Sequence, residues 1–218
     1  MQRLLDIIIP SRCLHCSRIL PTHQHLCISC LHQLPYTHWE FHRPNQIHEN
    51  FSSLKNFLGG NALLFYTHGN ATYKLLHANK YYNQPQVGKF LAQLSFYKLH
   101  EIDFEAVIPI PSYSKTLKSR GYNQTHLIAE SIANEFNVPV YKSCLKRIKQ
   151  SSSQTKKNRK QRLSVSAENF ICQQKISEKK VLFIDDVITT GGTLKACIQS
   201  FLEKNDTSFY IFCLAQAN

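Results

Sequence analysis

The feature that most constrains the fold is the stretch VLFIDDVITTGGTL at residues 181–194. Residues 181–184 form a short apolar run between charged residues, which is typical of a strand buried on both faces of a parallel sheet. After the loop, apolar residues recur at helical spacing from Leu194 to Leu202. Thr193 stands at the expected N-cap of that helix. The stretch therefore predicts a strand, a loop and a helix of an α/β fold.

The loop between this strand and helix carries groups that suit a sugar phosphate. A helix N-terminus preceded by glycines presents free N–H groups to an anion, and threonine hydroxyls donate further hydrogen bonds. The loop residues concerned are Thr189, Thr190, Gly191, Gly192 and Thr193. Asp185 and Asp186 precede them and suit hydroxyl groups or a metal ion better than the phosphate itself. A phosphate next to a diol describes a ribose 5-phosphate.

The same stretch resembles the phosphoribosyl pyrophosphate (PRPP) motif of type I phosphoribosyltransferases, in which an acidic pair follows a strand and precedes a Thr/Gly-rich loop. The resemblance implies an α/β fold with a mainly parallel sheet flanked by helices. It also implies that Asp185 and Asp186 bind the ribose hydroxyls, and that residues 189–193 bind the 5-phosphate. The plainer alternative is an acidic turn between strand and helix whose glycines serve packing.

A second unit of strand, polar loop and helix occurs at residues 103–136. Residues 106–110 predict a buried strand, and Leu127, Ile128, Ile132 and Phe136 predict a helix. In type I phosphoribosyltransferases the loop after such a strand takes the pyrophosphate. The residues matching that loop are Ser112, Tyr113, Lys115 and Arg120. Further elements are expected from a strand at 62–66, a helix from about Asn70 and a helix over 86–99. Lys80 near the end of the first helix is equally consistent with a phosphate ligand and with a solvated lysine.

Four of the eight cysteines form two Cys-x-x-Cys pairs, Cys13 with Cys16 and Cys27 with Cys30. Two such pairs let four thiolates converge on one Zn²⁺, whereas disulfides or a redox dithiol would not require two matched pairs. We therefore expect a closed structural zinc site in a small N-terminal module that does not fold without metal. His15, His23 and His25 remain possible substitutes for one thiolate.

The formal charge of +12 is concentrated in residues 142–162, which contain nine cations and no acidic residue. Such a block is either a solvated loop or a site for anions, and a polyanion relieves the repulsion among its charges. The candidate ligands within this block are Arg147, Lys149, Lys156, Lys157, Arg159, Lys160 and Arg162. We predict that they contact phosphate or single-stranded DNA. Tyr81, Tyr82, Tyr113 and Tyr122 are candidates for stacking on bases.

Taken over its whole length, the chain resembles the ComF family of competence-associated proteins. The resemblance rests on the four-cysteine module, on Tyr66, Leu75, Leu76 and Lys80, on "IPIP" at 108–111 with "RGYNQ" at 120–124, and on the acidic-pair loop. A further family feature appears as Arg147, Lys149, Ser151, Gln154 and Arg162. The chain departs from the family pattern at Ser151, Lys157 and Val165.

The resemblance implies a PRPP-binding protein of natural transformation that acts on internalised single-stranded DNA in the cytoplasm. Mg²⁺ would accompany PRPP and bridge its pyrophosphate and ribose oxygens. Whether phosphoribosyl transfer occurs is left open, since neither an acceptor nor a general acid or base is evident. The alternatives are a nucleobase phosphoribosyltransferase and a catalytically inert, zinc-containing adaptor that binds DNA.

For domain organisation, the sequence predicts a zinc module at 1–40, a linker at 41–60 and a phosphoribosyltransferase-like domain at 61–218. The N-terminus makes a poor signal peptide, because Asp6 interrupts its apolar stretch and no small-residue cleavage site follows. No apolar run approaches the length of a membrane span. We therefore expect a cytoplasmic protein that can meet other DNA-uptake proteins at the inner face of the membrane.

Overall fold

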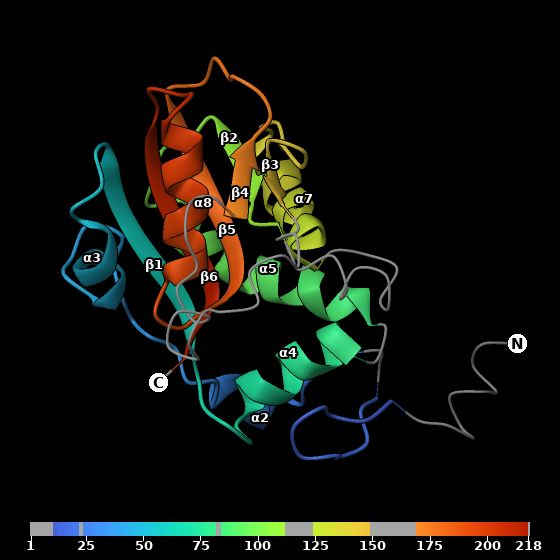
Figure 1. Ribbon diagram of the computed structural model, residues 1–218. Coiled ribbons are helices and arrows are strands. Elements are labelled where there is room, and N and C mark those ends of the chain that lie inside the picture. Colours follow the sequence, from blue (N-terminus) through green and yellow to red (C-terminus); the bar gives the residue numbers. More distant parts are fainter. Residues whose placement is uncertain (1–10, 22–23, 82–83, 112–123, 149–168, 218) are drawn as a thin grey trace, which may run out of the picture.

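The computed structural model describes residues 11–21, 24–81, 84–111, 124–148 and 169–217. At its centre is a four-stranded parallel sheet with the strand order β1-β6-β5-β2 (Figure 1). The strands are β1 (Phe57–Tyr66), β2 (Ala106–Pro109), β5 (Lys180–Ile188) and β6 (Ser208–Ala217). The predicted strands at 62–66 and 181–184 are confirmed as parts of β1 and β5. The strand predicted at 106–110 is confirmed as β2, which ends one residue earlier.

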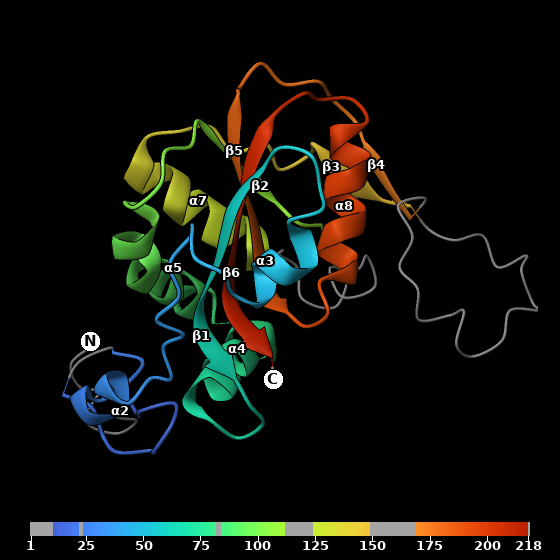
Figure 2. The same cartoon turned by 90° about the vertical axis from the view of Figure 1, so that its left-hand side faces the viewer.

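Helices cover both faces of the sheet, which is seen between them in Figure 2. On one face lie α8 (Gly192–Leu202) and the short α3 (Gln46–Phe51). On the other lie α5 (Pro85–Leu99) and α7 (Gln124–Phe136). After β1 the chain enters α4 (Ala71–Tyr81), which begins where expected because the Asn70 side chain accepts a 2.8 Å hydrogen bond from the Tyr73 N–H. The predicted α/β architecture with a parallel sheet is confirmed.

The alternation of side chains along β5 creates two cores. Val181 and Phe183 are fully buried on the α8 face, where the Phe183 ring meets Phe201 edge to face at 5.2 Å between centroids. Leu182 and Ile184 are fully buried on the opposite face, among residues of α4, α5 and α7. A strand buried on both faces needs an unbroken apolar run, which explains the composition of residues 181–184.

Beside the main sheet, β3 (Leu145–Arg147) and β4 (Phe170–Cys172) form an antiparallel ribbon. The ribbon is extended by a 2.8 Å hydrogen bond from the Ile148 N–H to the Asn169 carbonyl oxygen. The ribbon therefore holds side by side the two points at which the chain leaves for residues 149–168 and returns.

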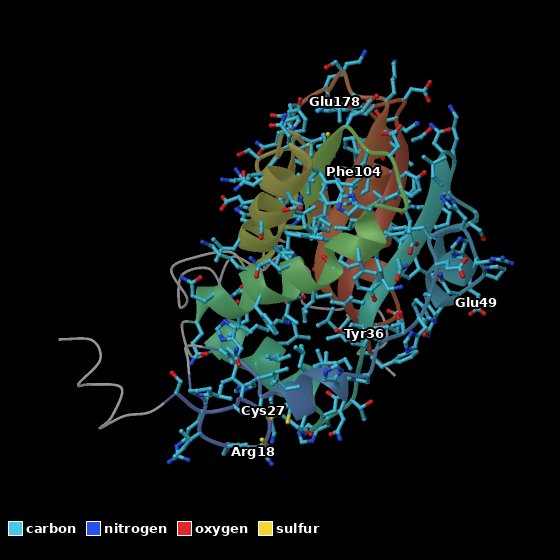
Figure 3. All side chains as sticks on the ribbon, turned by 180° about the vertical axis from the view of Figure 1, so that it is seen from behind. Arg18, Cys27, Tyr36, Glu49, Phe104 and Glu178 are labelled. Atoms are coloured by element: carbon cyan, nitrogen blue, oxygen red, sulfur yellow. The ribbon has the colours of Figure 1, made fainter. Side chains whose placement is uncertain are left out.

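The four-cysteine module contains the short helix α2 (Ile28–His32) and packs against α4 and α5. The Lys74 ammonium on α4 donates a 2.7 Å hydrogen bond to the His15 carbonyl oxygen, and the His25 ring lies 5.3 Å from the Phe90 ring on α5. Leu20 and Leu26 belong to the same buried cluster as Leu75. Figure 3 shows the module, labelled at Arg18 and Cys27, at the end of the molecule away from Phe104 and Glu178.

The interval 41–60, predicted to be a linker, is built into the main domain. It contains α3 and the first residues of β1, and Phe41, Ile47 and Phe51 are fully buried. The linker expectation for this interval is thus corrected, because its apolar residues fill the sheet's two cores. The wider division into two domains stays a prediction.

Among the described residues, no helix has the length and apolar character needed to cross a bilayer.

Candidate functional site

The acidic pair lies at the carboxyl edge of the sheet, inside β5 rather than in the loop after it. Successive side chains of a strand point to opposite faces, so Asp185 follows Phe183 toward α8 while Asp186 follows Ile184 toward α4. β2 ends at Pro109, opposite Ile184, whereas β5 continues to Ile188. The end of β5 therefore extends past β2, at the edge where open α/β sheets bind their ligands.

Asp185 lies in an apolar setting beneath α8. Burial, and then the charge of Asp186, raise the pKa of the Asp185 carboxyl to about 8. Burial, followed by the charge of Asp185, also raises the pKa of the Cys197 thiol on α8 and of the Cys213 thiol, whose residue is the register partner of Asp185 on β6. At neutral pH the Asp185 carboxyl can therefore both donate and accept a hydrogen bond.

Asp186 is held on the other face of the sheet by Lys80. The Lys80 ammonium at the end of α4 lies 2.5 Å from Asp186 Oδ2, and the two side chains are 24% and 19% exposed. Asp186 Oδ1 accepts a 2.7 Å hydrogen bond from the Val187 N–H. Sequence alone left Lys80 undecided between ligand and solvated residue, and the structure places it against the acidic pair.

A glycine turn connects the end of β5 to α8. Gly191 has φ +74° and is the N-cap of α8, which begins at Gly192. The expectation that Thr193 is the N-cap is therefore wrong, because the left-handed turn at Gly191 starts the helix two residues earlier. A Cβ on Gly191 would lie 2.9 Å from the Phe51 ring, so the turn is packed tightly against α3.

The remaining loop residues line the approach to this turn. Thr189 and Thr190 are exposed, and Gly192 and Thr193 are half-buried in the first turn of α8. The first N–H groups of a helix have no intrahelical acceptor, so this turn can donate to an anion. The loop, the acidic pair and Lys80 thus meet at one edge of the sheet.

Many predicted ligand residues lie outside the described residues. These are Ser112, Tyr113, Lys115 and Arg120 of the pyrophosphate loop, Lys149, Lys156, Lys157, Arg159, Lys160 and Arg162 of the basic block, and Tyr82 and Tyr122. Of the basic block, Arg147 is described at the end of β3, where its guanidinium lies 5.4 Å from the centre of the Phe170 ring. The placement of the residues outside the described ranges, relative to the acidic pair, stays a prediction.

The four N-terminal cysteines converge as their spacing predicts. Their sulfur atoms all lie within 4.8 Å of one another, and Cys16 Sγ and Cys27 Sγ are 3.7 Å apart. A tetrahedral ion with metal–sulfur bonds of about 2.3 Å separates its sulfurs by roughly 3.8 Å, so the geometry fits a structural metal ion. Burial, together with the neighbouring sulfurs, raises the pKa of Cys30 to about 12. Four thiolates therefore require a cation among them.

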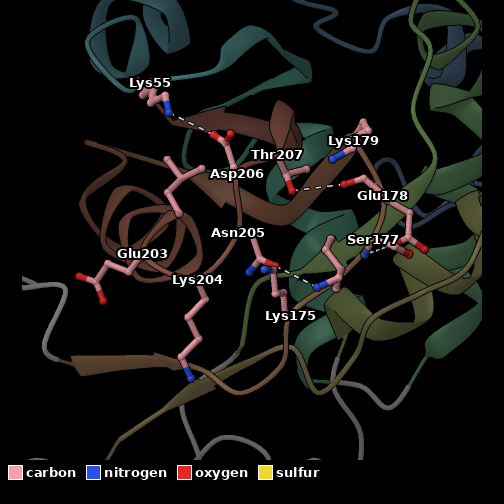
Figure 4. A pocket seen from close by; sticks show the side chains of 12 residues that line it. Lys55, Lys175, Ser177, Glu178, Lys179, Glu203, Lys204, Asn205, Asp206 and Thr207 are labelled. Carbon is pink, nitrogen blue, oxygen red and sulfur yellow. Dashed lines mark hydrogen bonds and ion pairs between the residues drawn. The ribbon is translucent and has the colours of Figure 1, made fainter.

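A cavity of about 420 Å³ lies at the opposite, amino edge of β5 and β6 (Figure 4). Its lining mixes both charges, and its polar groups largely pair with each other. Lys55 lies 3.1 Å from Asp206, and the Asn205 side chain accepts a 2.9 Å hydrogen bond from the Ile176 N–H. This self-paired cavity is at the wrong end of the strands for the ligand of a parallel sheet.

The sequence interpretation missed a row of aromatic rings that leads along α4 to Lys80. Tyr73 lies 5.8 Å from Tyr66, 4.7 Å from His68 and 5.6 Å from His77, measured between ring centroids. Tyr73, His77 and Lys80 share one helix face by their spacing. The signal was visible as Tyr73 and His77 four residues apart, but Tyr66 and His68 join the row only through the fold.

Comparisons with known proteins support this reading of the fold. Residues 125–217 match the phosphoribosyl transferase domain family. The chain is 28% identical over 153 residues to competence protein F of Haemophilus influenzae, covering 66% of this chain and 67% of that protein. It is 30% identical over 111 residues to competence protein ComFC of Bacillus subtilis, covering 50% of this chain and 43% of that protein.

Among solved structures, glutamine PRPP amidotransferase from B. subtilis, complexed with ADP and GMP, aligns with a TM-score of 0.40. That alignment has 13% identity and covers 82% of this chain and 32% of the amidotransferase. The parallel sheet, its flanking helices and the matched domain define a phosphoribosyltransferase-like protein. Within that class, the chain is similar to competence proteins F and ComFC, in agreement with the resemblance to the ComF family.

The glycine turn yields a test of the site's architecture. Gly191→Ala should lower the free energy of unfolding by about 1–3 kcal/mol, because a side chain is strained at positive φ and meets the Phe51 ring. Gly192→Ala is the matched control, since the nearest atom to its Cβ is Thr190 Oγ1 at 3.8 Å. Urea denaturation measures both variants. Equal losses would contradict the tight packing assigned to Gly191.

Proposed function

We propose that the chain binds PRPP at the carboxyl edge of its sheet and acts on single-stranded DNA during natural transformation. The observation that carries the proposal is the meeting of the acidic pair, the glycine turn and the start of α8 at one edge of a phosphoribosyltransferase-like sheet. The names of the two relatives support the role in competence. Action in the cytoplasm, together with DNA-uptake proteins at the inner membrane face, belongs to the same proposal.

In the proposed complex, each end of the ribose phosphate meets a different chemical group. The N–H groups at the start of α8 and the hydroxyls of Thr189, Thr190 and Thr193 donate to the 5-phosphate. Asp186 accepts from one ribose hydroxyl, and Asp185 exchanges a hydrogen bond with the other. When bound, Mg²⁺ supplies charge neutralisation for the pyrophosphate oxygens. Ser112, Tyr113, Lys115 and Arg120 are proposed for the pyrophosphate because β2 runs toward the same edge.

The acidic pair gives the most direct mutational test. Asp185→Asn combined with Asp186→Asn should abolish PRPP binding, measured by calorimetry in excess Mg²⁺, because both hydroxyl partners change. The single change Asp185→Asn should not destabilise the fold at pH 8. Folding raises the pKa of the Asp185 carboxyl from about 3.8 to about 8, so the free energy of unfolding falls as the pH rises through this range. An uncharged amide at position 185 does not ionise and therefore removes this pH-dependent loss. Unchanged PRPP affinity in the double variant would refute the proposed site.

The proposed DNA contact rests on charge and on the ribbon. β3 and β4 hold Ile148 and Asn169, the described residues on either side of the basic segment, next to each other. The formal charge of +12 favours a polyanionic partner. The aromatic row from Tyr66 to His77 adds ring faces on which bases can stack, beside the proposed sugar-phosphate site.

The basic segment is tested by changing Lys156, Lys157, Arg159, Lys160 and Arg162 to Ala. We expect single-stranded DNA binding with little sequence preference, and a logarithmic salt slope that falls by several units in the variant, at about 0.7 for each lost phosphate contact. Fluorescence anisotropy at a series of salt concentrations measures the slope. Wild-type affinity and slope in the variant would mean that the segment is only a solvated loop.

We further propose that the metal of the four-cysteine site is zinc. Tetrahedral thiolate ligation suits Zn²⁺, and the sulfur separations fit it. Elemental analysis of the purified protein should give about one zinc per chain, and Cys27→Ser should lower both the zinc content and the melting temperature. The assignment would be contradicted if the wild-type protein contained no zinc while Cys13, Cys16, Cys27 and Cys30 were reduced, and if Cys27→Ser left the melting temperature unchanged.

Two other functions are separated by the same measurements. A nucleobase phosphoribosyltransferase would bind PRPP but not single-stranded DNA. An inert zinc-containing adaptor would bind DNA but not PRPP. The basic block favours the proposed function over the first alternative, because transfer to a free nucleobase requires no polyanion site.

A further inference from the structure

Lys80 forms an ion pair with Asp186, and neither ribose nor phosphate recognition as proposed above uses this lysine. Its ammonium lies 2.5 Å from Asp186 Oδ2 with both side chains largely covered. α4 is fixed by Leu75 and Leu76, which are buried against the sheet. Lys80 stands four residues after Leu76, on the helix face that turns toward β5.

The ion pair leaves Asp186 oriented but not saturated. Oδ1 accepts from the Val187 N–H and Oδ2 accepts from Lys80. Each carboxylate oxygen can accept a further hydrogen bond, so the group can still receive a ribose hydroxyl. A carboxylate held on both oxygens cannot rotate to follow a different ligand, and this favours one geometry of the diol.

The ion pair also sets the charge of the acidic pair. An ionised Asp186 carboxylate without a cationic partner would attract a free divalent cation and repel a polyphosphate. A metal cation that approaches Asp186 must displace the Lys80 ammonium, which lies 2.5 Å from Asp186 Oδ2. Across the sheet, the Lys80 charge also lowers the pKa of the Asp185 carboxyl, against the larger upward effects of burial and of the Asp186 charge.

We propose that Lys80 is a positioning residue of the sugar-phosphate site, which orients Asp186 toward the ribose diol and keeps free divalent cations off the acidic pair. Metal would then enter only with the ligand's pyrophosphate. The part concerning the diol rests on the proposed function. The part concerning free cations does not depend on it. A purely structural lysine would instead only tie α4 to the sheet.

The test compares Lys80→Met, which keeps the aliphatic stem, with Lys80→Arg, which keeps the charge. Lys89→Met is the control, since Lys89 is an exposed lysine on α5. Mn²⁺ binding to the full chain without PRPP is followed by electron paramagnetic resonance. We expect the Met variant to bind Mn²⁺ about tenfold more tightly than the wild type, because the Lys80 ammonium no longer competes with Mn²⁺ for Asp186. Lys80→Arg and Lys89→Met should match the wild type, and adding Asp186→Asn to Lys80→Met should remove the gain.

The same proteins are then titrated with PRPP in excess Mg²⁺. We expect Lys80→Met to weaken PRPP binding by about tenfold, with Lys80→Arg restoring most of it. Equal Mn²⁺ affinity of the wild type and Lys80→Met overturns the exclusion of free cations. PRPP binding by the wild type with an unchanged Lys80→Met affinity overturns the positioning role. If the wild type binds no PRPP, the proposed function and the positioning role fail together, while the Mn²⁺ result still decides the exclusion of free cations.

Discussion

The site depends on the change from apolar to acidic residues within β5, at the point where its pairing with β2 ends. Up to Ile184 both faces of β5 are sealed by apolar side chains, and the next two residues are acids. Because strand side chains alternate, this boundary sends Asp185 under α8 and Asp186 toward α4. Two adjacent carboxyls are thereby given different surroundings, one apolar with a raised pKa and one paired with an ammonium. The glycine turn then starts α8 beside the first of them.

The four-cysteine module is connected to this site through α4. The module's leucines share a buried cluster with Leu75 and Leu76, and Lys74 bonds to the His15 carbonyl oxygen. Lys80, at the other end of the same helix, reaches Asp186. A metal ion that orders the module would therefore also stabilise α4, the helix that carries Lys80.

Much of this arrangement follows from local sequence, and its exceptions have physical causes. Apolar runs identify β2 and β5 because buried parallel strands require them, and paired Cys-x-x-Cys spacing identifies the four cysteines that converge. α3 escaped prediction because a helix of six residues, capped by Asn45, is too short to show periodicity. Gly191 displaced Thr193 as N-cap because tertiary packing against Phe51 selects the left-handed turn. The Lys80–Asp186 pair joins residues far apart in sequence, which only the packing of α4 brings together.

The central claim is that one edge of the sheet binds a sugar phosphate in a protein that also binds single-stranded DNA. Isothermal titration calorimetry of the wild-type chain with PRPP and Mg²⁺, repeated with a saturating single-stranded oligonucleotide, tests it most directly. The account predicts saturable binding of about one PRPP per chain. It also predicts a PRPP affinity that changes when the oligonucleotide is present, because the aromatic row proposed to stack on bases lies beside the proposed sugar-phosphate site. No heat of PRPP binding, with or without the oligonucleotide, would contradict it.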